Sequence, residues 1–104
     1  MTNVTSESGV VRSTTVGKID FLLVRDGPML WRWAKLLSDA VPDKGERNWT
    51  KGRDHNDLIR FRAGAARHFE QWLAGECDGD HAAAIFFNVN GAEHVEARWR
   101  GDAR

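Results

Sequence analysis

Apolar residues recur with a helical period in three separate stretches of this chain. Within each stretch they follow spacings of three and four residues, which place them on one face of an α-helix. The pattern predicts helices over residues 28–40, from 54 or 57 to 74, and 80–99. The apolar positions are Leu30, Trp33, Ala34, Leu37 and Val41, widened by Met29 and Leu36, in the first stretch; Leu58, Phe61, Ala65, Phe69 and Trp72 in the second; and Ile85, Val89, Ala92, Val95 and Trp99 in the third.

Helix-boundary residues support these three ranges. Pro28 suits the first position of a helix, and we expect that helix to stop before Pro42. Aspartate is a preferred N-cap, and glycine commonly ends a helix. The corresponding residues are Asp54 or Asp57 and Gly75 for the second helix, and Asp80 for the third.

The rest of the chain lacks this period. Residues 1–16 are rich in Ser, Thr and Val and are predicted to be a flexible leader. The apolar run Phe21 to Val24 predicts a brief strand or an extended segment packed on the core. The fold class is therefore all-α: one helical domain over residues 17–100, with three main helices and a short basic tail at 101–104.

Composition limits the partners and the compartment. Fifteen basic and fifteen acidic residues cancel, so nucleic acid is an unlikely partner and no field draws the chain to a membrane. No run approaches the roughly 20 apolar residues of a membrane span. The single cysteine, Cys77, excludes an internal disulfide and fits a cytoplasmic protein. Five Trp and five Phe are enough to supply an interface, and we expect a homo-oligomer.

Polar residues interrupt the predicted helices near one connection. His81 and Asn88 share a face of the third helix, and antiparallel packing would bring His68 of the second helix towards His81. Carboxylates at the same end would then favour Mg²⁺ or Mn²⁺. The alternative is a solvated turn with an ordinary N-cap. The carboxylates concerned are Glu76, Asp78 and Asp80.

A second polar segment lies in the loop between the first two helices. An aromatic plane such as Trp49 can stack on a base, and Lys51 beside it can neutralise phosphate. The alternative is that Trp49 closes the end of the core while Lys51 faces solvent. The same two alternatives, phosphate binding and exposure to solvent, apply to Lys18 on weaker grounds.

Together these motifs resemble a known family, the phage-associated dATP/dGTP diphosphohydrolase N-terminal domain, which is related to MazG-like all-α nucleotide pyrophosphohydrolases. The resemblance covers about residues 18–89. It is carried by Lys18-Ile19-Asp20-Phe21-Leu22, the helix Ala34–Ala40, the loop Gly45-Glu46-Arg47-Asn48-Trp49-Thr50-Lys51-Gly52, and Arg67-His68, Gly75-Glu76, Asp78, His81 and Asn88.

The resemblance implies an oligomeric enzyme that uses Mg²⁺ or Mn²⁺ to split a purine deoxynucleoside triphosphate into monophosphate and pyrophosphate. The alternative is a non-catalytic module on the same scaffold that binds a nucleotide or a protein. The implied catalytic residues are Glu76, Asp80, His81 and His68; the implied metal ligands are Glu76, Asp78 and Asp80; and the implied nucleotide-binding residues are Lys18, Asn48, Trp49, Lys51, Arg67 and Asn88.

Overall fold

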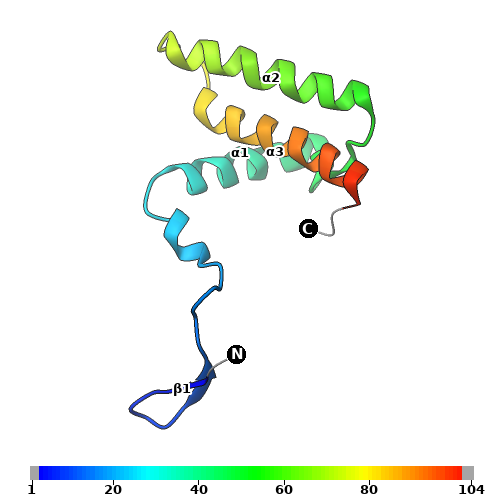
Figure 1. Cartoon of the computed structure of the whole chain (residues 1–104). Helices are drawn as coiled ribbons and strands as arrows, with labels where there is room; N and C mark the ends of the chain where they lie inside the picture. The colour runs from blue at the N-terminus through cyan, green and yellow to red at the C-terminus, as the bar shows by residue number, and fades with distance from the viewer. Residues whose placement is uncertain (1–2, 102–104) are drawn as a thin grey trace.

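Three helices form the body of the protein (Figure 1). They are α1 (Met29–Lys44), α2 (His55–Leu73) and α3 (His81–Arg100), in a computed structural model that describes residues 3–101. α2 and α3 form an antiparallel pair, and α1 packs against α3. The predicted all-α class with three main helices is therefore confirmed. Within residues 3–101 no helix combines the length and apolar character needed to cross a membrane.

Local hydrogen bonds explain where α2 and α3 begin. The Asp54 side chain accepts from the backbone N–H of Asp57 at 2.8 Å. The Asp57 side chain in turn accepts from the backbone N–H of Asp54, and the two bonds make a capping box. Asp80 accepts from the Ala83 N–H at 3.0 Å and caps α3. Gly75 adopts a φ of 75° just beyond α2, a conformation that glycine adopts without strain.

The core lies between α2 and α3, where the two backbones approach closely. Leu58, Ala92 and Val95 are buried there, with Phe61 packed against them. Gly91 leaves room for the Phe61 ring, because a Cβ at Gly91 would lie 2.4 Å from its Cε1 atom. Small residues at the crossing thus set the spacing of the helix pair.

The predicted apolar faces of α2 and α3 are partly wrong. Phe69 and Trp72 of α2, and Val89 and Trp99 of α3, are about half exposed. The rows of residues that α2 and α3 turn towards each other instead include polar residues and glycines. Two helices that pack closely leave room only for small side chains at the contact. These inner positions are Leu58, Phe61, Gly64, Ala65, His68 and Gln71 on α2, and His81, Ala84, Asn88, Gly91, Ala92 and Val95 on α3.

α1 also differs from its predicted range and face. It continues through Pro42 to Lys44, and the Gly45 N–H still bonds to the Val41 carbonyl at 2.9 Å. Proline lacks an N–H, so this last turn carries one hydrogen bond fewer than usual. Leu30 and Val41 are exposed, because α1 contacts its neighbour along one edge that includes Trp33, Leu36 and Leu37.

The N-terminal segment carries structure that the sequence pattern does not predict. β1 (Asn3–Thr5) and β2 (Val11–Ser13) pair antiparallel, with Val4 opposite Arg12. The β-branched residues flank a Ser- and Gly-containing turn, a combination that favours a hairpin. Of the predicted leader 1–16, residues 1–2 lie outside the described part; of the predicted tail 101–104, only Gly101 lies inside it, as the C-cap of α3.

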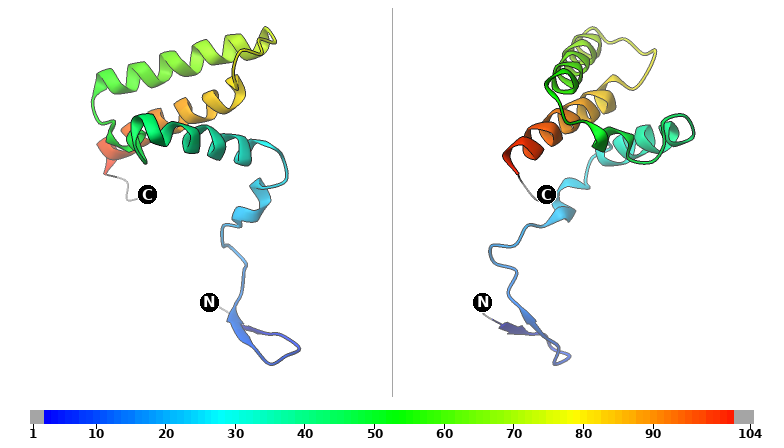
Figure 2. Two further views of the ribbon diagram at one scale, coloured as in Figure 1. Left: turned by 180° about the vertical axis from the view of Figure 1, so that it is seen from behind. Right: turned by 90° about the vertical axis from the view of Figure 1, so that its right-hand side faces the viewer.

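The apolar run after the hairpin forms a 3-10 helix, η1 (Phe21–Val24), capped by Asp20, which accepts from the Leu22 N–H at 2.9 Å. The prediction of a strand or of a segment packed on the core is therefore wrong. Its four side chains are exposed, and the segment leads away from the three helices in every view (Figures 1 and 2). We call residues 3–24 the N-terminal arm.

Candidate functional site

A cavity of about 610 Å³ opens between the three helices, a size typical of small-molecule sites. We call it the polar cavity. Its lining combines charged and amide side chains with apolar side chains of α1 and α3. Its lining residues are Leu36, Leu37, Ala40 and Lys44 of α1; Arg67, His68 and Gln71 of α2; Asp78, Gly79 and Asp80 of the connection; and His81, Ala84, Phe87 and Asn88 of α3.

Three of these side chains form a continuous hydrogen-bonded chain. Asp78 Oδ1 lies 2.6 Å from His81 Nε2, and His81 Nδ1 lies 2.9 Å from His68 Nδ1. His81 is buried, His68 is partly buried, and Asp78 is largely exposed. The chain therefore runs from solvent through a buried imidazole to a second imidazole that lines the cavity.

This chain fixes which nitrogen of His68 can accept a proton. An ionised Asp78 accepts the hydrogen on His81 Nε2, so a neutral His81 presents a lone pair at Nδ1. His68 then donates from Nδ1 and keeps a lone pair on Nε2. Burial, followed by the charge of Arg67, lowers the pKa of His68. The hydrogen bond from His81 lowers the pKa of Asp78, so both groups favour the forms that this arrangement requires.

A bidentate ion pair holds the beginning of α3 against α1. Arg32 donates from Nε to Asp80 Oδ2 at 2.8 Å and from Nη2 to Asp80 Oδ1. This geometry is the strongest form of an arginine–carboxylate contact. The Arg32 hydrogen bond holds the pKa of Asp80 below its usual value, and the helix-capping bond from Ala83 acts in the same direction. Asp80 thus locks two helices at the rim of the polar cavity.

Asp80→Ala is expected to lower the free energy of unfolding by about 1–2 kcal/mol at neutral pH, mainly through loss of the N-cap. Because the pKa of Asp80 is lower in the folded state than in the unfolded state, its stabilisation is present above the unfolded value. It is lost as the pH falls through the lowered folded value. The free energies of unfolding of the wild type and of Asp80→Ala should therefore approach each other as the pH falls. Urea unfolding of the two proteins between pH 7 and pH 3 measures this difference.

Asp39→Ala is the matched control, because Asp39 makes only an exposed pair with Lys35 on α1, of the kind that contributes little. An equal loss in both variants at pH 7 would contradict the role given to Asp80.

Two amides complete the lining of the polar cavity. Asn88 donates from Nδ2 to the Ala84 carbonyl at 2.8 Å and lies against Gly64, where a Cβ would come within 2.5 Å of its Oδ1. Within residues 3–101, Gln71 Oε1 is a buried acceptor without a hydrogen-bond donor. Such an atom costs about 1–3 kcal/mol unless water or a ligand bonds to it. Gln71 is therefore positioned to contact a bound molecule.

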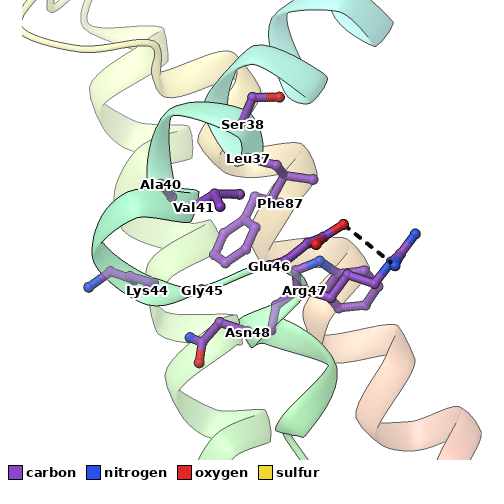
Figure 3. Close-up of a pocket in the computed structure, with 11 residues that line it drawn as sticks. Leu37, Ser38, Ala40, Val41, Lys44, Gly45, Glu46, Arg47, Asn48 and Phe87 are labelled. Atoms are coloured by element: carbon purple, nitrogen blue, oxygen red, sulfur yellow. Dashed lines mark ion pairs between the residues drawn. The ribbon is translucent and has the colours of Figure 1, made fainter.

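A second hollow of about 240 Å³ lies between the end of α1, the loop after it and Phe87 of α3 (Figure 3). We call it the loop pocket. Leu37, Val41 and Phe87 form its apolar side, and Asn48 closes it from the following loop. The two hollows share lining residues, so they lie next to each other on the helical body. The shared residues are Leu37, Ala40, Lys44 and Phe87.

The loop that closes this pocket is fastened to the far end of α3. It contains the 3-10 helix η2 (Asn48–Lys51), and the Thr50 carbonyl accepts from Arg98 at 3.0 Å and contacts His94 Nε2 at 3.2 Å. The Trp49 ring meets the His94 ring edge to face, with centroids 5.1 Å apart. Trp49 therefore packs on α3 while it also lines the loop pocket.

The structure brings together most, but not all, of the residues predicted for the site. The polar cavity collects six of them: Arg67, His68, Asp78, Asp80, His81 and Asn88. Asn48 and Trp49 line the loop pocket instead. Lys51 is exposed on η2, Glu76 is exposed after α2, and Lys18 is exposed on the N-terminal arm.

The predicted metal ligands do not converge. Across residues 3–101, no group of three or more His, Cys, Asp and Glu side chains is placed to hold a metal ion. Asp80 is engaged by Arg32, and Asp78 is engaged by His81. Among the described residues the carboxylates therefore form no ready-made group for Mg²⁺ or Mn²⁺.

Several contributing residues carry no signal in the sequence. Arg32 and Lys44 lie among the polar positions of α1, and Phe87 falls outside the predicted apolar stripe of α3. Gln71 lies among the polar positions of α2, and nothing in the sequence marks its buried oxygen. Only the placement of α1 across α3 brings Lys44, Gln71 and Phe87 to one cavity and Arg32 to its partner Asp80.

The fold and the cavity define a small helical domain with a concave surface rich in imidazole, carboxylate and guanidinium groups. The profile of the family described as dATP/dGTP diphosphohydrolase, N-terminal, matches residues 8–103. The chain therefore belongs to that family, and the resemblance drawn from its motifs is confirmed. Comparison with curated proteins and with solved structures finds no match.

Proposed function

We propose that this domain binds a purine deoxynucleoside triphosphate and hydrolyses it to the monophosphate and pyrophosphate. The observation that carries the proposal is the adjacency of two hollows of different chemistry. The polar cavity offers positive charge and a hydrogen-bonded imidazole chain, and the loop pocket offers an apolar surface beside an amide. The family name supports a nucleotide as the substrate.

The triphosphate is assigned to the polar cavity. Arg67 of α2 and Lys44 of α1 approach it from two helices and bring the positive charge that phosphates require. Gln71 and Asn88 add amide groups that can bond to phosphate or ribose oxygens. Asp80 is neutralised by Arg32, which limits its repulsion of an anionic ligand.

The base is assigned to the loop pocket. Leu37, Val41 and Phe87 present an apolar surface against which a flat ring can pack. The Asn48 amide both donates and accepts, so it can bond to the edge of a purine. Arg47 adopts a left-handed φ of 54° just before Asn48, a strained conformation of the kind often found at binding loops.

The chemical step follows from the lone pair on His68 Nε2. A water molecule attacks the α-phosphorus, the bond from that phosphorus to the bridging oxygen breaks, and pyrophosphate leaves with the electron pair. His68 takes the proton from the water as general base. His81 and Asp78 hold the imidazole in the correct tautomer and stabilise the positive charge that it acquires.

In this proposal the divalent metal ion is bound to the substrate and not to a site of its own on the protein. A nucleoside triphosphate carries Mg²⁺ on its phosphate oxygens, where the ion neutralises charge. Because the carboxylates of this chain do not form a metal group within the described residues, they are assigned to orientation and helix capping.

Incubation of the 104-residue chain with each deoxynucleoside and ribonucleoside triphosphate and Mg²⁺ tests the proposal. We expect monophosphate and pyrophosphate, in equal amounts, from a purine deoxynucleotide. Arg67→Ala removes a charged phosphate contact and should weaken nucleotide binding about 10- to 100-fold. Chromatography of the products and calorimetric titration measure these two quantities.

Arg60→Ala is the control, because Arg60 is an exposed arginine two turns earlier on α2 and does not line the polar cavity. Folded chain that converts no nucleotide would overturn the enzymatic assignment. Nucleotide binding without turnover would establish the non-catalytic module instead.

A further inference from the structure

The N-terminal arm presents an apolar segment that the rest of its own chain leaves uncovered. Phe21, Leu22, Leu23 and Val24 are 62–76% exposed, and Ile19 before them is 80% exposed. Leaving a large apolar side chain in water forgoes the favourable free energy of burying it. Five such residues in a run of six are more than the scattered apolar exposure of an ordinary surface.

The helical body carries an apolar groove of about 450 Å³ that is also uncovered. We call it the lateral groove. It lies where the beginnings of α1 and α3 meet the last turns of α2, and Phe69, Trp72 and Phe86 in it are about half exposed. Its apolar lining residues are Met29, Phe69, Trp72, Ala82, Ile85 and Phe86.

The total exposed surface is larger than that of a compact monomer of the same mass, and the extended arm contributes to the excess. The chain exposes 8295 Å², whereas a folded monomer of 11.7 kDa exposes about 5,900 Å². Its radius of gyration is 18.4 Å, against about 13 Å for a compact chain of this length. The excess of roughly 2,400 Å² matches the area that one subunit buries in a large homodimer interface.

We infer that the N-terminal arm of one copy packs its apolar segment, residues 19–24, into the lateral groove of a second copy. Each chain carries both the segment and the groove, so reciprocal exchange about a two-fold axis covers both in both copies and closes the assembly. The arm already extends away from its own helices, so the exchange does not require the body to unfold (Figure 2).

A second copy suits the arm better than a lipid surface does. The apolar segment is flanked by Lys18 and Arg25 and by Asp20 and Asp26, so its neighbouring charges cancel. Stable binding of an exposed apolar segment to an anionic membrane calls for an accompanying basic patch. The lateral groove supplies an aromatic surface without that requirement.

Light scattering after size-exclusion chromatography of the 104-residue chain tests the exchange. We expect a dimer at micromolar concentration. Leu23→Asp in the arm and Phe86→Asp in the groove should each give a monomer with an unchanged helical circular dichroism spectrum. Val16→Asp, which changes an equally exposed arm residue outside residues 19–24, should remain dimeric.

Cysteine pairing then identifies the two surfaces. In a Cys77→Ser background, one preparation carries Leu22→Cys and the other carries Phe86→Cys. We expect a disulfide between the two preparations when they are mixed and oxidised, and little bonding within either one. Preferential bonding within the Leu22→Cys preparation would indicate an arm-to-arm interface and overturn the exchange.

Two further results would also overturn it. A monomer at every concentration, with an intramolecular disulfide in the Leu22→Cys/Phe86→Cys double variant, would show that the arm folds back onto its own groove. A monomer that binds phosphatidylcholine–phosphatidylserine vesicles through residues 19–24 would assign the apolar segment to a lipid surface.

Discussion

His68→Gln is expected to lower kcat for the purine nucleotide by about 10²–10⁴-fold, the usual contribution of a positioned general base. Glutamine can still donate a hydrogen bond towards His81, but it has no nitrogen that can take a proton from water. The Michaelis constant should change much less, because Arg67 and Lys44 remain in the polar cavity. Steady-state kinetics with Mg²⁺ and saturating nucleotide measure both constants.

The pH dependence of the same variant separates a catalytic role from a structural one. Since burial and the charge of Arg67 lower the pKa of His68, the wild-type rate should fall only when the pH drops below the ordinary histidine range. His68→Gln should lose that acid limb. Over the same range the unfolded state binds more protons than the folded state, so wild-type stability should also fall as the pH drops below about 6.5.

His55→Gln is the matched control for this experiment. His55 lies at the beginning of α2, where its ring stacks on Trp99, away from the polar cavity. We expect its kcat and pH profile to match the wild type. Equal activity of His68→Gln and wild type, in proteins with the same circular dichroism spectrum, would remove His68 from the mechanism.

Gly91→Ala is expected to lower the free energy of unfolding by about 1–3 kcal/mol, although alanine is the better helix former by about 1 kcal/mol. The new Cβ would lie 2.4 Å from Phe61 Cε1. The Phe61 ring has little room to retreat, because Phe87 meets it edge to face at 6.0 Å and Gly52 lies close to its opposite edge. Urea unfolding followed by circular dichroism measures the loss.

A double-mutant cycle shows whether the loss arises from that contact. Phe61→Leu removes the ring edge, so the combined variant should be less unstable than the sum of the two single changes, by about 0.5–3 kcal/mol. Gly79→Ala is the control, since a Cβ there meets nothing within 4 Å. Additive losses would mean that Gly91 is not required for the approach of α3 to Phe61.

The Phe61 contact also links stability to the site. Phe87, which packs on Phe61, lines both the polar cavity and the loop pocket. A substitution that displaces the Phe61 ring should therefore disturb nucleotide binding as well as folding. The close helix approach at Gly91 therefore also sets the shape of the two hollows that Phe87 lines.

Local sequence patterns were enough to predict the three helices, their order, the beginning of α3, and the beginning of α2 to one of two aspartates. These features depend on interactions within a few residues, such as the Asp54 and Asp80 caps and the period of the apolar residues. Even the approach of His68 to His81 could be predicted, because a short connection forces α2 and α3 to run antiparallel.

Which residues face the cavity depends on the packing of the helices against one another. The periodic pattern placed Phe69, Trp72 and Val89 in the core, whereas close packing at Gly64 and Gly91 turns smaller and polar positions inward. The pairing of Arg32 with Asp80 joins residues 48 positions apart, and no local pattern encodes such a contact. Long-range packing fixed the rotation of each helix, and that rotation selects the side chains that form the site.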